Sequence, residues 1–160
     1  MNMQHIETLM YNPFYLSKVI QSFLTGYEKE LDFKTTFYVL PIVMYRESRN
    51  RLLHANSRST LYSIFSKDVK FEEYNSKINS KFSLSQVTEM FNEYIEITKQ
   101  SIIILENQKK IKIYTKIVLV EKFHYTNTPN SIKEYFRSAY YLGQILSDIN
   151  LEEFENFLEI

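Results

Sequence analysis

Cysteine and tryptophan are absent from this chain of 160 residues, and it has only two glycines. Without cysteine there is no disulfide, no thiolate ligand for zinc and no thiol nucleophile. Gly26 and Gly143 are far apart, whereas a phosphate-cradling loop needs several glycines close together. The chain therefore has neither a Walker loop nor a dinucleotide-binding loop.

An excess of charge of either sign is also missing: 19 Lys and Arg balance 19 Asp and Glu. This argues against an autonomous nucleic-acid binder with a broadly basic surface, although a local basic patch remains open. No apolar run approaches the roughly 18 residues of a membrane span, and the N-terminus lacks the pattern of a signal peptide. We expect a soluble cytoplasmic protein of one domain.

Helix signals dominate the first hundred residues. Asn12 and Pro13 predict a cap and first turn, and we expect Gly26 to end this helix in the left-handed conformation. Because Pro41 disfavours a central strand, residues 33–45 are read as a helix that begins near Thr35 or Thr36 and is kinked or divided at the proline.

Further helices are expected up to residue 100. Residues 46–58 form a polar connection, and Ser57 or Ser59 caps a helix that resumes after Asp68. Ser83 and Gln86 resemble a capping box at the start of residues 83–100.

Strand signals follow. Residues 101–114 read as two short strands around a turn at 106–110, and residues 116–125 extend the second strand or add a third. A turn at 126–130 precedes a long helix and a short acidic one. The predicted fold is α+β and mainly helical, winged-helix-like, with the β-hairpin as the wing. One domain spans residues 1–160: helices at 12–100, the hairpin region at 101–122 and C-terminal helices at 129–160.

No group of residues predicts catalysis. His5, His54 and His124 are far apart and lack ligand spacing, and no serine lies in a G-x-S-x-G elbow. The adjacent glutamates at 72–73 and 152–153 would diverge on a helix. We therefore predict no catalytic, cofactor or metal site.

Two basic features are candidates for contact with DNA or a protein partner. The first is an arginine-rich segment, which in the alternative pairs with acids elsewhere in the chain, including those of the C-terminal tail. The second is the hairpin edge, whose lysines in the alternative only discourage edge aggregation. Guanidinium groups suit phosphates and carboxylates. The candidates are Arg46, Arg49, Arg51, Arg58, Lys109, Lys110 and Lys112.

An apolar stripe in residues 135–146 reads as a core face, with a partner interface as the alternative, and Gly143 in it would permit a close helix crossing. The tail, residues 151–160, would dock its apolar side chains on this chain or on a partner.

Five segments follow one another in a fixed order: "NPF", "GY", "FYVLPIVMYRESRNRLL", "SRSTLYSIF" and "SAYYLGQIL". This series resembles the middle component of bacterial three-component ABC systems (ABC-3C), and Lamassu-like antiphage defence systems are built in a similar way. Phe65 and Tyr45 depart from the family pattern, where Trp and His are typical. The residues that carry the resemblance are Asn12, Pro13, Gly26, Tyr27, Leu40, Pro41, Leu142 and Gly143.

The resemblance implies a non-enzymatic adaptor that links an SMC- or Rad50-like ABC ATPase to an effector. It implies no cofactor and no membrane, and DNA contact through the complex. A free-standing winged-helix DNA-binding regulator is the alternative from another class, and a small hydrolase is a third. The zero net charge, and the excess of acid over base in residues 83–100, favour the adaptor.

Overall fold

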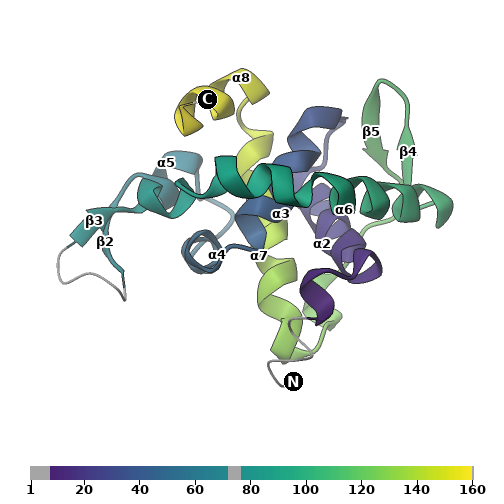
Figure 1. Ribbon diagram of the computed structural model, residues 1–160, viewed down its shortest axis with the longest axis horizontal. Helices are drawn as coiled ribbons and strands as arrows, with labels where there is room; N and C mark the ends of the chain where they lie inside the picture. Colours follow the sequence, from purple (N-terminus) through teal and green to yellow (C-terminus); the bar gives the residue numbers. More distant parts are fainter. Residues whose placement is uncertain (1–7, 72–76, 160) are drawn as a thin grey trace.

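The computed structural model describes residues 8–71 and 77–159, and it shows a helical body with a small β-ribbon at each end of its long axis (Figure 1). The fold is mainly helical α+β, as predicted. In chain order the elements are α2 (Pro13–Tyr27), β1 (Leu31–Asp32), η1 (Phe33–Thr35), α3 (Thr36–Val43), α4 (Arg46–Leu52), α5 (Leu61–Phe65), β2 (Asp68–Lys70), β3 (Lys77–Asn79), η2 (Ser80–Leu84), α6 (Val87–Asn107), β4 (Ile111–Ile113), β5 (Lys116–Leu119), η3 (Tyr125–Asn127), α7 (Asn130–Ser147) and α8 (Leu151–Leu158).

Helix α2 is the centre of the core. The Asn12 side chain accepts hydrogen bonds from the N–H groups of Phe14 (2.9 Å) and Tyr15 (3.4 Å), which confirms the predicted cap. Nearly every residue from Tyr15 to Gly26 is buried, because α6 and α7 both pack on this helix.

Gly26 does not end α2, so that prediction was wrong. The helix continues to Tyr27, and the left-handed residue after it is Glu28, with φ of 60°. Gly26 is instead required by a close approach: a Cβ there would lie 1.9 Å from the carbonyl oxygen of Tyr140 on α7. A Cβ on Gly143 would lie 2.1 Å from the carbonyl oxygen of Phe23, which confirms the predicted close crossing.

Helix α3 contains Pro41 and is almost fully buried. It begins at Thr36, as predicted, and packs on α6 and α7. An interior proline removes one helical hydrogen bond, but a buried apolar helix of two turns is held here by its packing rather than by its propensity.

Four predictions for residues 46–86 were wrong. Residues 46–52 form helix α4 rather than a polar connection, and the cap of α5 is Thr60, which exchanges hydrogen bonds with Ser63 in a capping box. After Asp68 the chain forms the strand pair β2–β3, with Val69 opposite Ile78, and not a helix. The expected capping box at Ser83 is absent, since Ser83 belongs to η2.

The hairpin exists, but it begins later than predicted. Residues 101–105, expected as strand, and residues 106–107, expected as the start of the turn, are the last turns of α6, where Ser101, Ile102 and Leu105 continue its buried face. The hairpin is β4–β5, and β1 joins it to give the order β1-β5-β4, with Leu31 and Ile113 both opposite Ile117. The winged-helix likeness remains a prediction.

Helix α7 lies across α2, and α8 follows it as predicted. The apolar stripe of α7 belongs to the core: Phe136, Ala139 and Leu142 are almost completely buried. From the tail, Phe154 packs into the same core, whereas Ile160 lies outside the described residues.

Among the described helices, none combines the length and apolar character needed to cross a membrane.

Candidate functional site

The arginine-rich segment is divided between the core and the surface. Arg49 is buried, and its guanidinium donates hydrogen bonds to the carbonyl oxygens of Val43 (3.1 Å) and Met44 (3.0 Å) at the end of α3. It also lies 4.3 Å from the ring centre of Tyr135 and 3.5 Å from a carboxylate oxygen of Glu134. Arg49 therefore joins α3 to α7 and is not available to a partner, while Arg46 is exposed at the start of α4.

The alternative in which the arginines pair with acids of the same chain holds for Arg49, whose acidic partner is Glu134. Of the C-terminal acids, Glu155 pairs with Lys34 (3.0 Å) and Glu159 pairs with Lys81 (3.1 Å). These two contacts hold α8 against η1 and η2.

The hairpin lysines form a separate surface. In Figure 1 the β4–β5 hairpin lies at the opposite end of the molecule from α5 and β2–β3. Lys109 and Lys112 are exposed, whereas Lys110 pairs with Glu121. The structure thus does not bring the two predicted basic features together.

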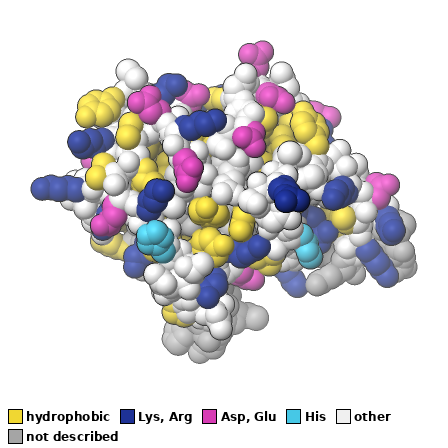
Figure 2. Space-filling model, turned by 180° about the vertical axis from the view of Figure 1, so that it is seen from behind, with side chains coloured by type: hydrophobic (Ala, Val, Ile, Leu, Met, Phe, Trp, Pro, Cys, Tyr) yellow, Lys and Arg dark blue, Asp and Glu magenta, His cyan; other side chains and the backbone are white. Residues whose placement is uncertain are grey.

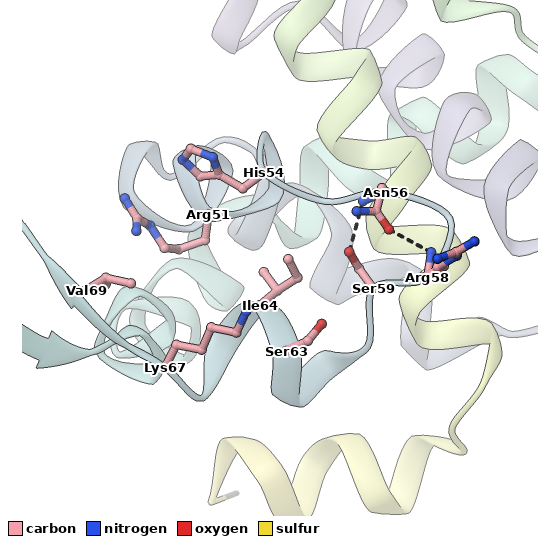
Figure 3. Close-up of a pocket in the computed structure, with 9 residues that line it drawn as sticks. All are labelled: Arg51, His54, Asn56, Arg58, Ser59, Ser63, Ile64, Lys67 and Val69. Atoms are coloured by element: carbon pink, nitrogen blue, oxygen red, sulfur yellow. Dashed lines mark hydrogen bonds between the residues drawn. The ribbon is translucent and has the colours of Figure 1, made fainter.

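A pocket of about 510 Å³ lies beside the surface arginines (Figure 3). We call its four basic residues, Arg51, His54, Arg58 and Lys67, the basic pocket. They come from α4, from the turn that follows it and from the link between α5 and β2. The remaining lining residues are Asn56, Ser59, Ser63, Ile64 and Val69.

The turn that carries His54 and Arg58 is held by hydrogen bonds within it and by hydrogen bonds from α7. The backbone N–H of Asn56 donates to Ser59 Oγ (2.9 Å), and that of Arg58 donates to Asn56 Oδ1 (2.8 Å). Arg137 on α7 donates to the carbonyl oxygens of Leu53 (2.8 Å) and Ala55 (3.0 Å). Arg137 therefore positions the pocket without lining it.

The positive charge of the basic pocket is not compensated. Within residues 8–71 and 77–159, no carboxylate lines it and none of its basic side chains makes an ion pair with an acid. The Arg51 guanidinium lies 5.6 Å from the ring centre of Phe71, and its Nε is buried without a hydrogen-bond partner. A hollow lined by charges of one sign focuses the field and attracts anions.

The wider surface has the same character. On the face shown in Figure 2, Lys and Arg side chains gather toward the right edge, which is the end that carries β2 and β3.

The arrangement of the residues that line the basic pocket suits binding more than the making or breaking of bonds. Ser63 Oγ is engaged with Thr60, and the described residues hold no cluster of three or more His, Cys, Asp or Glu suited to a metal ion. His5 and the glutamates at 72–73 lie outside the described residues.

Sequence reasoning found Arg51 and Arg58 but missed His54, Lys67 and Arg137. For His54 the sequence does contain a signal, the spacing of positions 51, 54 and 58. Basic residues at such a spacing come together where the chain turns back after a helix. No signal in the sequence places Lys67 or Arg137 against that turn, because both contacts depend on how α5 and α7 pack.

The residues that carry the family resemblance are structural. Asn12 and Pro13 begin α2, Leu40 and Pro41 lie buried in α3, and the rest lie at the crossing of α2 and α7. They specify the core rather than the basic pocket.

Comparison with known proteins gives one result. No curated protein and no solved structure matches the chain. The family model described as ABC-three component (ABC-3C) system Middle Component 3 matches residues 1–160. This match covers the whole chain, including the segments that form α2, α3 and α7. The chain therefore belongs to the Middle Component 3 family of ABC-three component systems.

Proposed function

We propose that this chain is a non-catalytic adaptor that links an SMC- or Rad50-like ABC ATPase to an effector, in prokaryotic defence against phages or plasmids. The observation that carries the proposal is the match to a middle-component family along residues 1–160. A component of a multi-component ABC system works through its surfaces. The protein acts in the cytoplasm, and DNA is reached through the assembled complex.

The distribution of charge supports an adaptor with two contact surfaces. Arg46, Arg51 and Arg58 lie toward one end of the molecule, and Lys109 and Lys112 lie at the other. Exposed charges of this kind steer association and set its salt dependence more than they set raw affinity. Surfaces at opposite ends let two partners bind one copy without competing.

Co-purification of the three components tests the role. The tagged chain is co-expressed with the ATPase and the effector encoded beside it, and the ATPase is expected to co-purify with it. The effector should join the ATPase only when the middle component is present. An ATPase–effector complex that forms equally well without this chain would contradict the proposal.

The contact surfaces are tested by charge reversal. Lys109→Glu with Lys112→Glu, and separately Arg46→Glu with Arg58→Glu, should each weaken one partner and spare the other. Lys18→Glu, at an exposed position of α2, is the matched control. Loss of neither partner in either double variant would remove these residues from the proposal.

The alternative, a free-standing winged-helix regulator, makes the opposite prediction for the isolated chain. It requires tight, sequence-specific and salt-sensitive binding to duplex DNA. The feature that supports this alternative is the sheet of order β1-β5-β4, whose β4–β5 hairpin directly follows α6. An adaptor should bind duplex DNA only weakly on its own.

A further inference from the structure

We propose that the basic pocket binds a phosphate ester, either a nucleotide or a nucleic-acid strand. The site is formed by Arg51, His54, Arg58 and Lys67. This inference does not depend on the adaptor role, because it concerns a ligand of this chain alone.

Geometry gives the first reason. Three consecutive parts of the chain line the pocket: α4, the following turn and the segment from α5 to β2. In Figure 3 the side chains of Arg51 and Arg58 lie on opposite sides of it. A volume of about 510 Å³ lies within the range of small-molecule sites. It has room for more than a single phosphate group.

Charge gives the second reason. Some basic side chains elsewhere on the described surface pair with acids: Lys34 pairs with Glu155, and Lys81 with Glu159. Among the described residues that line the basic pocket there is no acid, and like charges that line one hollow repel one another. Such a cluster of like charges lowers the stability of the fold. Features that lower stability are expected at functional sites.

The third reason is the match in donors. Guanidinium groups bind phosphate oxygens through paired hydrogen bonds, and Arg51 and Arg58 present two of them here. Asn56 adds a side-chain amide whose oxygen is already used by the Arg58 N–H, which leaves its NH₂ group as a donor. Ile64 and Val69 supply an apolar wall for a sugar or base.

The turn is also prepared before any ligand arrives. Arg137 and the Asn56–Ser59 hydrogen bonds fix the backbone between α4 and α5. Less conformational freedom is therefore lost on binding, which favours affinity.

Binding measurements on the purified full chain test the site. The probes are ATP and a short fluorescent single-stranded DNA oligonucleotide, followed by calorimetry and anisotropy. We expect at least one of them to bind, with affinity lowered about tenfold by Arg51→Gln and about tenfold by Arg58→Gln. Lys18→Gln removes the same charge at an exposed position of α2 and should leave binding unchanged.

The two sources of phosphate give different results. A nucleotide site binds ATP, and the oligonucleotide competes only weakly. A strand site binds the oligonucleotide with a salt slope that falls by roughly 0.7 for each phosphate contact removed. Polyglutamate competes poorly in both cases, since it lacks phosphate.

Three outcomes overturn the proposal: neither probe binds, Arg51→Gln and Arg58→Gln bind as well as wild type, or polyglutamate displaces the probe as well as ATP does. The last outcome would indicate an acidic protein face as the occupant. Unfolding midpoints establish that the variants fold. If one does not, Lys67→Gln, at an exposed position, takes its place.

Discussion

Gly26 on α2 and Gly143 on α7 lie at one helix crossing, and each allows the backbone of the other helix to approach. A Cβ at Gly26 would lie 1.9 Å from the carbonyl oxygen of Tyr140, and one at Gly143 would lie 2.1 Å from that of Phe23. Ser22 ties the same helices, since its hydroxyl donates to the carbonyl oxygen of Phe136 (2.7 Å). Both glycines of the chain are thus used at this one contact.

Gly26→Ala and Gly143→Ala should each destabilise the protein by about 3 kcal/mol or more, because the clash is with backbone and not with a movable side chain. Helix propensity alone predicts the opposite sign, about 1 kcal/mol of stabilisation. Denaturant unfolding measures the difference, with Lys18→Ala on the exposed face of α2 as the control. A neutral or stabilising Gly→Ala would show that the helices are not in such close contact.

Arg49→Ala should lower the free energy of unfolding by about 2–4 kcal/mol, since the last carbonyl groups of α3 lose buried donors and Tyr135 loses its cationic neighbour. Arg58→Ala is the matched control, because Arg58 is exposed, and should change stability by less than about 0.5 kcal/mol. Equal stability losses in the two variants would contradict the assignment of Arg49 to the core.

Asn12→Ala should cost about 1 kcal/mol, because the N–H groups of Phe14 and Tyr15 lose the acceptor that caps α2. Asn12→Asp keeps an acceptor oxygen and should be close to wild type. Thermal unfolding of the three proteins measures the effect, and a loss in Asn12→Asp equal to that in Asn12→Ala would argue against the cap.

Stability should fall as the pH rises above about 10. Burial raises the pKa of Tyr94 to about 12, with smaller contributions from Tyr11 and Glu93, and burial also raises the pKa of Tyr15. The folded protein then holds protons that the unfolded chain, whose tyrosines ionise near pH 10, has released. The stabilisation is complete below pH 10 and is lost between pH 10 and 12.

Tyr94→Phe should therefore reduce the dependence of the unfolding free energy on pH in that window. The control is Tyr114→Phe, whose ring is exposed and lies on the hairpin. Chemical unfolding at a series of alkaline pH values measures both slopes. An unchanged slope in Tyr94→Phe would contradict the burial of its hydroxyl.

Local chemistry in the sequence accounts for much of the fold. Asn12 and Pro13 predict the start of α2, and Pro41 together with its apolar neighbours predicts a buried helix. The turn before residue 130 predicts the start of α7, and the full series of segments indicates the family. In each case the signal is a cap, a proline constraint or a helical period within one segment, so neighbouring residues are enough to express it.

Errors arose where a distant contact overrides the local signal. Residues 101–105 have the composition of a strand but continue α6, because their buried side chains extend its packed face. Gly26 has the character of a helix stop but lies within α2, because α7 needs its missing side chain.

The sequence by itself determined the mainly helical class, the main helix starts and the family, since these depend on neighbours along the chain. Only the tertiary structure decided which arginines reach solvent: Arg49 turns into the core, whereas Arg51 and Arg58 meet His54 and Lys67 at one hollow. The physical reason is that α4, α5 and α7 must pack before a charge is either buried against carbonyl groups or left facing water.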